Sequence, residues 1–345
     1  MNAAKAPFVT KLHDVFVREV KAGDLLRALA VISPLAAAYF LSGDPALLSL
    51  GLIAISLLIP ALKLQLTGKM VVFQFLAILI TFVALFLAAP VKPLFVMLTA
   101  LTGFLAVAVT RYGDALRTMG NWVFIPAVYL ACEVREQVSP AEAWRHASVV
   151  VALSPIALAL VCAVQIYDRR NRPAASPATY GPASHDWLLP ASATAIAVFA
   201  AAALVEVLNL AQGQWVMWSA ASVVVGDLTA STGKLKLRAT GAIVGVPLGL
   251  LVGLALPASR VGYSFAVLAT TLTLIAFSRY VVGFGSRCFF ITLAAAFAGG
   301  ASGIAEERVA NVLTGGTFGV IAVVLTEVVW RRFAQKAGGQ SGLPS

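Results

Sequence analysis

Arg287 lies in the stretch Gly283-Phe-Gly-Ser-Arg-Cys-Phe-Phe, which carries no other charge. A guanidinium group can hold a carboxylate through two parallel hydrogen bonds. Aromatic side chains that could stack on a ligand ring stand close by at Phe289 and, in an earlier apolar stretch, at Trp122 beside Asn121. These residues are candidates for binding an aromatic carboxylate. Alternatively, Arg287 is a charge whose long side chain reaches the membrane–water interface.

Lys234 and Arg238 form a second basic group at the entry to a later apolar stretch. The two cations could attract an organic anion, or they could simply mark the cytoplasmic border of a membrane helix. Asp227 closes the preceding apolar stretch, so its carboxylate could exchange a proton against an anion held by these cations. An ordinary ion pair at a helix end is the alternative for Asp227.

Glu206 and Glu327 are the other acidic residues within or at the edge of apolar runs. We expect Glu206 near the outer face of the membrane and Glu327 near the inner face. A carboxyl group exchanges protons near neutral pH when burial raises its pKa. Both residues are therefore candidates for proton coupling, together with Asp227.

Two further sets of residues are expected to be structural. Arg111 and Arg279 follow equivalent apolar runs, and we expect them to hold helix carbonyl groups at the inner face. Gly241, Gly245 and Gly249 repeat every four residues and place glycine on one face of a helix, which favours close helix packing. The same glycine face could instead narrow a substrate path.

The elements that carry these residues must be membrane helices. Of the 345 residues, 60% are hydrophobic and 12% are charged, whereas soluble proteins have about 25% charged residues. The three cysteines are scattered and only three histidines are present, so neither a metal site nor a disulfide framework is expected. Nucleotide-binding and metalloprotease motifs are missing from the sequence, so we expect no cofactor and no enzyme activity.

The hydrophobic runs predict an all-α integral membrane protein with about twelve spanning helices, since about 20 apolar residues cross a bilayer. They fall at about 24–41, 45–62, 70–89, 93–110, 118–132, 148–167, 187–206, 214–228, 237–256, 262–279, 283–299 and 309–330. With both termini in the cytoplasm, only five of the 25 Lys and Arg residues lie outside, as the positive-inside rule requires. The five outside are Lys92, Arg135, Arg145, Arg260 and Arg308, and of these Arg145 and Arg308 are expected to form solvated ion pairs with Glu142, Glu306 and Glu307. Topology thus explains the net charge of +10, and nucleic acid is not an expected partner.

Landmarks recur at a nearly constant offset and predict two parallel six-helix repeats. Gly68-Lys69 corresponds to Gly233-Lys234, and Thr110-Arg111-Tyr112 corresponds to Ser278-Arg279-Tyr280. Asn121 is then the repeat mate of Arg287. The predicted organisation is an arm at 1–23, a first repeat at 24–167, a cytoplasmic linker at 168–186, a second repeat at 187–330 and a tail at 331–345.

The second repeat resembles the fusaric acid resistance and aromatic acid exporter families. Arg238, Gly241 and Gly245 match the family element Arg-x-x-Gly-Thr-x-x-Gly, although Thr240 precedes the glycine. The segment that begins Gln214-Trp-Val-Met-Trp is similar to the family's Tyr-Trp-Ala segment. The segment from Glu307 to Gly315, with Asn311 where Thr is usual, is similar to the start of its final helix.

The resemblance implies a multi-pass protein of the bacterial inner membrane that exports small aromatic or amphipathic organic anions, coupled to protons. It also implies a periplasmic adaptor protein and an outer-membrane channel as candidate partners, and a homo-oligomer is left open. Typical members carry a cytoplasmic domain after each six-helix unit, so this chain is expected to be a compact relative. A passive anion channel and a non-transporting membrane scaffold of an efflux assembly are the alternatives.

Overall fold

A computed structural model describes residues 18–136, 139–171, 180–183, 186–299 and 301–339. The predicted arm, linker and tail therefore lie partly outside the described residues. Within them the chain forms α-helices and two short 3-10 stretches, at Val109–Tyr112 and Asp114–Leu116. The helices are α2 (Ala22–Ser42), α3 (Ala46–Lys63), α4 (Gly68–Ala88), α5 (Lys92–Ala108), α6 (Arg117–Arg135), α7 (Pro140–Asn171), α8 (Leu188–Leu208), α9 (Gln214–Val223), α10 (Leu228–Ala255), α11 (Arg260–Leu272), α12 (Tyr280–Phe297) and α13 (Ala301–Gly339).

Local sequence signals explain where several helices begin and end. Gly43 adopts a left-handed conformation after α2, with φ of 75°, and its N–H donates to the Tyr39 carbonyl at 2.7 Å. Glycine has no Cβ to oppose this conformation, so it ends a helix readily. The Ser259 hydroxyl accepts a hydrogen bond from the Gly262 N–H at 3.0 Å and so caps the start of α11.

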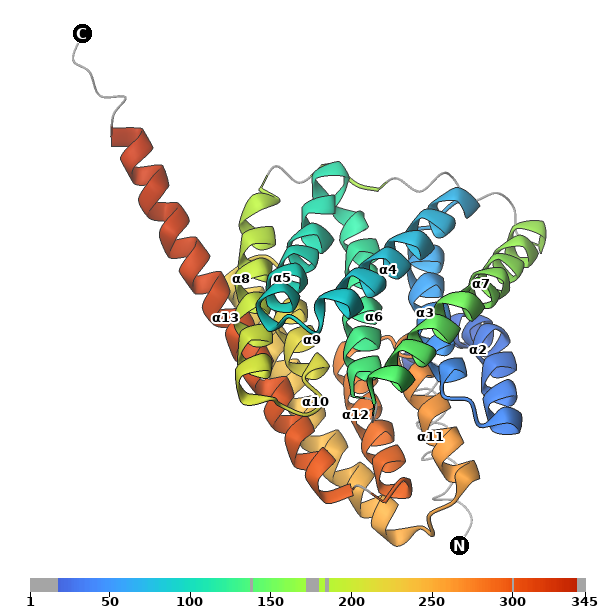
Figure 1. Cartoon of the computed structure of the whole chain (residues 1–345). Coiled ribbons are helices and arrows are strands. Elements are labelled where there is room, and N and C mark those ends of the chain that lie inside the picture. The colour runs from blue at the N-terminus through green and yellow to red at the C-terminus, as the bar shows by residue number, and fades with distance from the viewer. Residues whose placement is uncertain (1–17, 137–138, 172–179, 184–185, 300, 340–345) are drawn as a thin grey trace, which may run out of the picture. The chain divides into compact units, whose positions relative to one another are not determined.

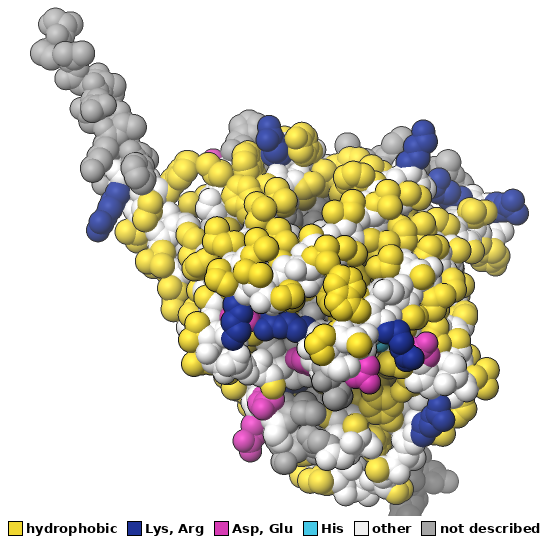
Figure 2. Space-filling model, viewed as in Figure 1, with side chains coloured by type: hydrophobic (Ala, Val, Ile, Leu, Met, Phe, Trp, Pro, Cys, Tyr) yellow, Lys and Arg dark blue, Asp and Glu magenta, His cyan; other side chains and the backbone are white. Residues whose placement is uncertain are grey.

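Nine helices of the described chain are long and apolar enough to cross a membrane. Large apolar side chains are exposed along α4, including Phe73, Leu76 and Ile80, and hydrophobic side chains cover much of the visible surface in Figure 2. In water such a surface would be unstable, whereas lipid is a suitable solvent for it. The chain is therefore a multi-pass α-helical membrane protein.

Three of the predicted spans differ from these nine helices. α9 has 10 residues and α11 has 13, and at 1.5 Å per residue each is too short to cross a hydrocarbon core of about 30 Å by itself. α6 has 19 residues, but it is not among the nine, because charged and polar residues lie along it. The apolar sequence continues past the ends of α9 and α11, but the helices do not.

The chain divides into two compact units, each built from three segments of the sequence. Unit 1 comprises Met1–Val71, Ser148–Ser176 and Leu237–Val309; unit 2 comprises Val72–Ala147, Pro177–Lys236 and Ala310–Ser345. In unit 1, α2 packs against α3 and α11, and α11 packs against α12. In unit 2, α5 packs closely along α8, and α9 packs against α6 and α8 (Figure 1).

Each unit takes its helices from both predicted repeats, and the two sets are complementary. From the first predicted repeat, unit 1 contains the first, second and sixth helices. From the second predicted repeat, it contains the main parts of the third, fourth and fifth helices. Unit 2 holds the remaining helices. The chain changes unit after Val71 and again after Lys236, 165 residues later; it changes after Ala147 and again after Val309, 162 residues later. The changes of unit therefore fall at nearly equivalent positions of the two predicted repeats.

The helix break after α11 is filled by the segment that precedes α2. Lys21 N–H donates to the Ala276 carbonyl, and Ser278 N–H donates to the Glu19 carbonyl, both at 2.8 Å. These bonds give the short antiparallel bridge between Val20 and Phe277. Backbone that leaves a helix inside a membrane protein needs such partners, because lipid offers none.

The break after α5 is filled in the same manner by the segment that precedes α8. Asp114 N–H donates to the Pro182 carbonyl at 3.2 Å, and Ala115 N–H donates to the Tyr180 carbonyl at 3.1 Å. Thus the residues before the first helix of each predicted repeat bind the break after the fourth helix of the other.

Candidate functional site

Arg238 lies on α10, and its side chain is buried in unit 1, with 1% of the residue exposed. Its guanidinium donates to the Tyr280 hydroxyl at 2.9 Å and lies 4.4 Å from the centre of the Phe284 ring. The buried Arg238 Nε has no hydrogen-bond partner among the described residues. A buried cation with a donor to spare is costly to maintain, which is a reason to look for a ligand at this position.

Arg287 approaches the same ring from its own helix, α12. Its guanidinium carbon lies 6.0 Å from the centre of the Phe284 ring. Its Nε and Nη2 donate to the hydroxyl and the carbonyl of Thr273, and both bonds are 3.4 Å long. Thr273 follows the last residue of α11, so Arg287 binds the end of that shortened helix.

Phe284 is therefore shared by two guanidinium groups. Tyr280 stacks on it, with ring centres 6.0 Å apart and planes inclined by 11°. The face of an aromatic ring is electronegative and attracts cations, which holds both arginines in this small region. We refer to Arg238, Thr273, Tyr280, Phe284 and Arg287 as the arginine cluster.

Glycine on α10 brings the two arginines within reach of one ring. A Cβ atom on Gly241 would lie 2.9 Å from the Phe284 ring and 3.0 Å from the Gly285 nitrogen. A Cβ on Gly245 would overlap the Gly285 carbonyl oxygen, and one on Gly249 would overlap the Phe289 carbonyl oxygen. The glycine face of α10 thus lies directly on the backbone of α12.

The structure places the other candidates for anion binding as follows. Phe289 packs edge-on against Phe290, with ring centres 5.0 Å apart, in the apolar contact of α11 with α12. Lys234 is half-buried on the part of α10 that belongs to unit 2, and Asn121 and Trp122 are half-buried on α6 of unit 2. Within unit 1 the aromatic contact of Arg287 is with Phe284, which the sequence reasoning did not select.

The candidates for proton coupling lie in three different environments. Asp227 is exposed, and its carboxylate accepts the Ala230 N–H at 2.8 Å, so it caps the start of α10. Glu327 is half-buried on α13 and lies 3.7 Å from Arg331, one helical turn further on. Glu206 is buried, with 3% of the residue exposed.

Arg111 and Arg279 both lie at the helix breaks. Arg279 pairs with Glu19 at 2.5 Å, and the Arg111 guanidinium lies 5.1 Å from the Tyr112 ring and 5.5 Å from the Trp187 ring. Both arginines are largely exposed, and the described contacts are with side chains rather than with the carbonyl groups expected.

Of the two arginines expected in solvated ion pairs, Arg308 is buried instead, with 2% of the residue exposed. Arg135 forms a two-bond ion pair with Glu206, in which Nη2 lies 2.7 Å from Oε2 and Nη1 binds Oε1. The partners in this pair are 71 residues apart, so hydropathy could place both near one face of the membrane but could not show that they meet.

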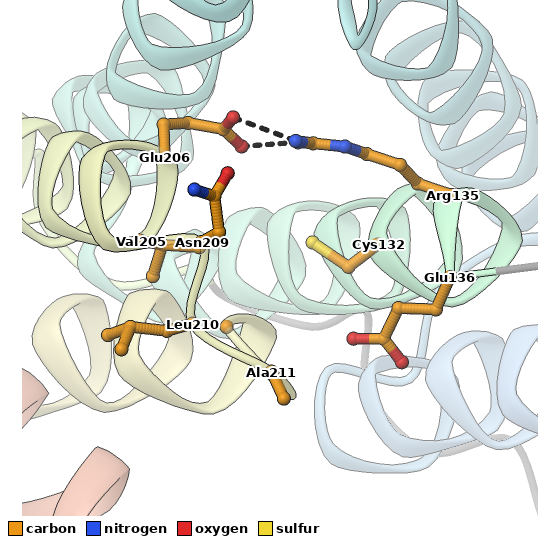
Figure 3. Close-up of a pocket in the computed structure, with 9 residues that line it drawn as sticks. Cys132, Arg135, Glu136, Val205, Glu206, Asn209, Leu210 and Ala211 are labelled. Atoms are coloured by element: carbon orange, nitrogen blue, oxygen red, sulfur yellow. Dashed lines mark hydrogen bonds and ion pairs between the residues drawn. The ribbon is translucent and has the colours of Figure 1, made fainter.

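Beside this ion pair is a cavity of about 230 Å³ in unit 2. Its lining includes Cys132, Glu136 and Asn209 in addition to Arg135 and Glu206 (Figure 3). The 209–213 loop closes one side of it. Residues Asn209 and Gln212 of that loop have positive φ angles, of 48° and 53°.

Residues 198–322 match the family described as fusaric acid resistance protein-like. The match confirms the resemblance seen in the second repeat and covers Glu206, Arg238 and Arg287. It indicates a role in membrane transport or efflux. Among curated proteins and among solved structures, none matches the chain.

Proposed function

We propose, from the place of residues 198–322 in the fusaric acid resistance protein-like family, that the protein is a secondary-active efflux transporter. It exports small aromatic or amphipathic organic anions across the bacterial inner membrane in exchange for protons. The observation that supports the substrate class is the arginine cluster, in which two guanidinium groups face one aromatic ring.

The arginine cluster suits a ligand that has a carboxylate and a flat ring. The two bonds from Arg287 to Thr273 are 3.4 Å long, whereas charge-assisted bonds to a carboxylate are about 2.7–2.9 Å and about twice as strong. A ligand carboxylate would therefore compete well for Arg287. Tyr280, which is 40% exposed and stacks on the buried Phe284, offers a flat ring to the rest of the ligand.

Ligand binding at Arg287 would also act on the helix break after α11. Arg287 binds the Thr273 carbonyl at the end of that helix, and carbonyl groups at a helix end need a partner. An anion that draws Arg287 away leaves this end without its bond. Binding is thus linked to the segment 273–279, where the N-terminal residues Glu19 and Lys21 are also attached.

Proton exchange requires a carboxyl group that releases its proton to the cytoplasm when the anion is carried outward. Asp227, Glu327 and Glu206 are the candidates. Asp227 and Glu327 belong to the end of the helices that the charge pattern assigns to the cytoplasm, where such a release would take place. An adaptor protein on the opposite side would extend the export path, and co-purification from solubilised membranes would test that partnership.

A thermal-shift screen with purified protein tests the substrate class. Benzoate combines a carboxylate with a ring, acetate lacks the ring, and benzylamine carries the opposite charge. We expect benzoate to raise the melting temperature, acetate to have a small effect and benzylamine none. Equal shifts with all three probes would contradict an aromatic anion site.

Conductance across planar bilayers separates the transporter from a channel. A transporter carries too few ions for single-channel steps, and its flux responds to an imposed pH gradient. Discrete current steps that ignore the pH gradient would favour a passive channel. Neither binding nor flux with any aromatic acid would favour a scaffold.

A further inference from the structure

The cavity beside Arg135 is lined by polar and charged side chains of unit 2. Arg135 reaches it from α6 and Glu206 from α8, and the two side chains point toward each other across it (Figure 3). The Glu206 carboxylate is almost fully buried, whereas 34% of the Arg135 side chain is exposed. The guanidinium is thus the member of the pair that a molecule in the cavity can reach.

Other side chains hold the cavity wall in place. Lys92 Nζ donates to the Glu206 carbonyl and to Asn209 Oδ1, both at 2.8 Å. Glu136 accepts from the backbone N–H and the side-chain amide of Gln212, at 3.2 and 3.1 Å. These bonds fix the 209–213 loop against α5 and α6, so the cavity does not depend on a mobile side chain for its shape.

Arg135 binds the Glu206 carboxylate through both terminal nitrogens of its guanidinium, Nη1 and Nη2. This two-bond geometry is the one that a guanidinium forms with any carboxylate, including that of a ligand. Glu206 therefore occupies the position that a ligand carboxylate would take. The charged or titratable groups around Glu206 are Arg135 and Cys132 from α6, Glu136 directly after that helix, and Lys92 from α5.

We propose that this cavity is a second carboxylate-binding site, at which Glu206 and an organic carboxylate compete for Arg135. When Glu206 is ionised it holds Arg135 and the anion is excluded. When Glu206 takes up a proton on a carboxylate oxygen, Arg135 is released and forms its two bonds with the ligand carboxylate. The proposal rests on the proposed function, since it assumes that organic anions pass through the protein.

In this scheme proton binding and anion binding favour each other. One proton and one anion bind together, so the pair adds no net charge to the cavity. An exchanger requires the opposite, that proton and anion bind in alternation. Glu206 is therefore not the group that drives export in this scheme; it sets how tightly the cavity holds the anion.

Binding of radiolabelled benzoate to the purified full-length protein tests this site. An Arg238→Gln/Arg287→Gln variant removes both guanidinium groups of the arginine cluster and leaves the cavity intact. Because one proton accompanies each anion, we expect its affinity for benzoate to rise by about tenfold for each unit that the pH falls, while free Glu206 is ionised. Adding Glu206→Gln should give tight binding that no longer depends on pH.

A control variant is needed to separate loss of benzoate binding from loss of folding. Replacing Arg135 alone leaves a buried carboxylate without its partner, and the protein could lose its fold. The double variant Arg135→Gln/Glu206→Gln removes both charges; in the Arg238→Gln/Arg287→Gln background it should fold and lose the remaining benzoate binding. Binding in Arg238→Gln/Arg287→Gln that is absent, or that does not change with pH, would overturn the proposal even if wild-type protein transports benzoate.

Discussion

Arg238 in unit 1 and Arg135 in unit 2 are both at least partly buried, but different groups stabilise their positive charges. Among the described residues, Arg238 contacts a phenol and an aromatic ring, whereas Arg135 holds a carboxylate with two bonds. The first guanidinium can accept an anion without displacing another charge. The second can do so only when Glu206 takes up a proton and releases the guanidinium. In our proposal the same residue type therefore serves an anion site without a competing carboxylate in one unit and a proton-controlled site in the other.

The largest effect that separates the two sites is expected from Arg238. An Arg238→Gln variant should lower benzoate efflux by about 30-fold or more, since loss of one charged partner in a buried contact costs about 2 kcal/mol or more. Efflux from proteoliposomes, corrected for the amount of folded protein, measures this.

Arg238→Lys is the matched control, because it keeps the charge but loses the planar two-bond geometry. It should retain part of the activity. Wild-type efflux from both variants would remove Arg238 from the site.

The next effect concerns the stability of unit 2. Arg135→Gln leaves Glu206 buried without its partner. Because 34% of the Arg135 side chain is exposed, we expect a loss of about 1–2 kcal/mol, between the values for exposed and for buried ion pairs. The melting temperature should fall markedly in Arg135→Gln and recover in Arg135→Gln/Glu206→Gln. An unchanged melting temperature in the single variant would mean that the pair is not formed in the protein.

Glycine substitutions on α10 should affect the arginine cluster and spare the cavity. Gly245→Ala places a Cβ on the Gly285 carbonyl oxygen, and overpacking of this kind costs about 1–3 kcal/mol. Gly233→Ala on the same helix meets no atom within 4 Å and serves as the control. Thermal unfolding should distinguish the two; equal melting temperatures would argue against the close packing of α10 on α12.

The smallest effect is expected from the ring that the two arginines share. Phe284→Leu keeps an apolar side chain but removes the aromatic face, and a cation over an aromatic ring is worth about 0.5–2 kcal/mol. Benzoate binding should weaken by about twofold to 30-fold, nearer to the lower value, while acetate binding changes little. Loss of both to the same extent would show that the ring only supports the fold.

Much of the architecture is visible in the sequence because hydropathy reports burial in lipid. The predicted spans 70–89 and 283–299 correspond closely to α4 and α12. The shortened helices were not predicted, since Val224 and Ile275 continue the apolar runs although they lie beyond the ends of α9 and α11. Composition does not record where the backbone leaves the helical conformation.

The candidate site was predicted in part for a similar reason. Arg238 and Arg287 stood out as charges near apolar sequence, but Phe284 looked like any other apolar residue until its position between them was known. The pairing of Arg135 with Glu206 joins α6 to α8. Such a contact depends on how helices distant in the sequence pack, which no local pattern encodes.

Benzoate efflux from proteoliposomes that contain the wild-type protein tests the central claim most directly. With labelled benzoate inside and an acidic medium outside, we expect saturable efflux that is faster than without the pH gradient, with acetate and benzylamine carried poorly. Benzoate efflux no faster than from protein-free vesicles, at every pH gradient, would contradict the proposal that this protein exports aromatic anions.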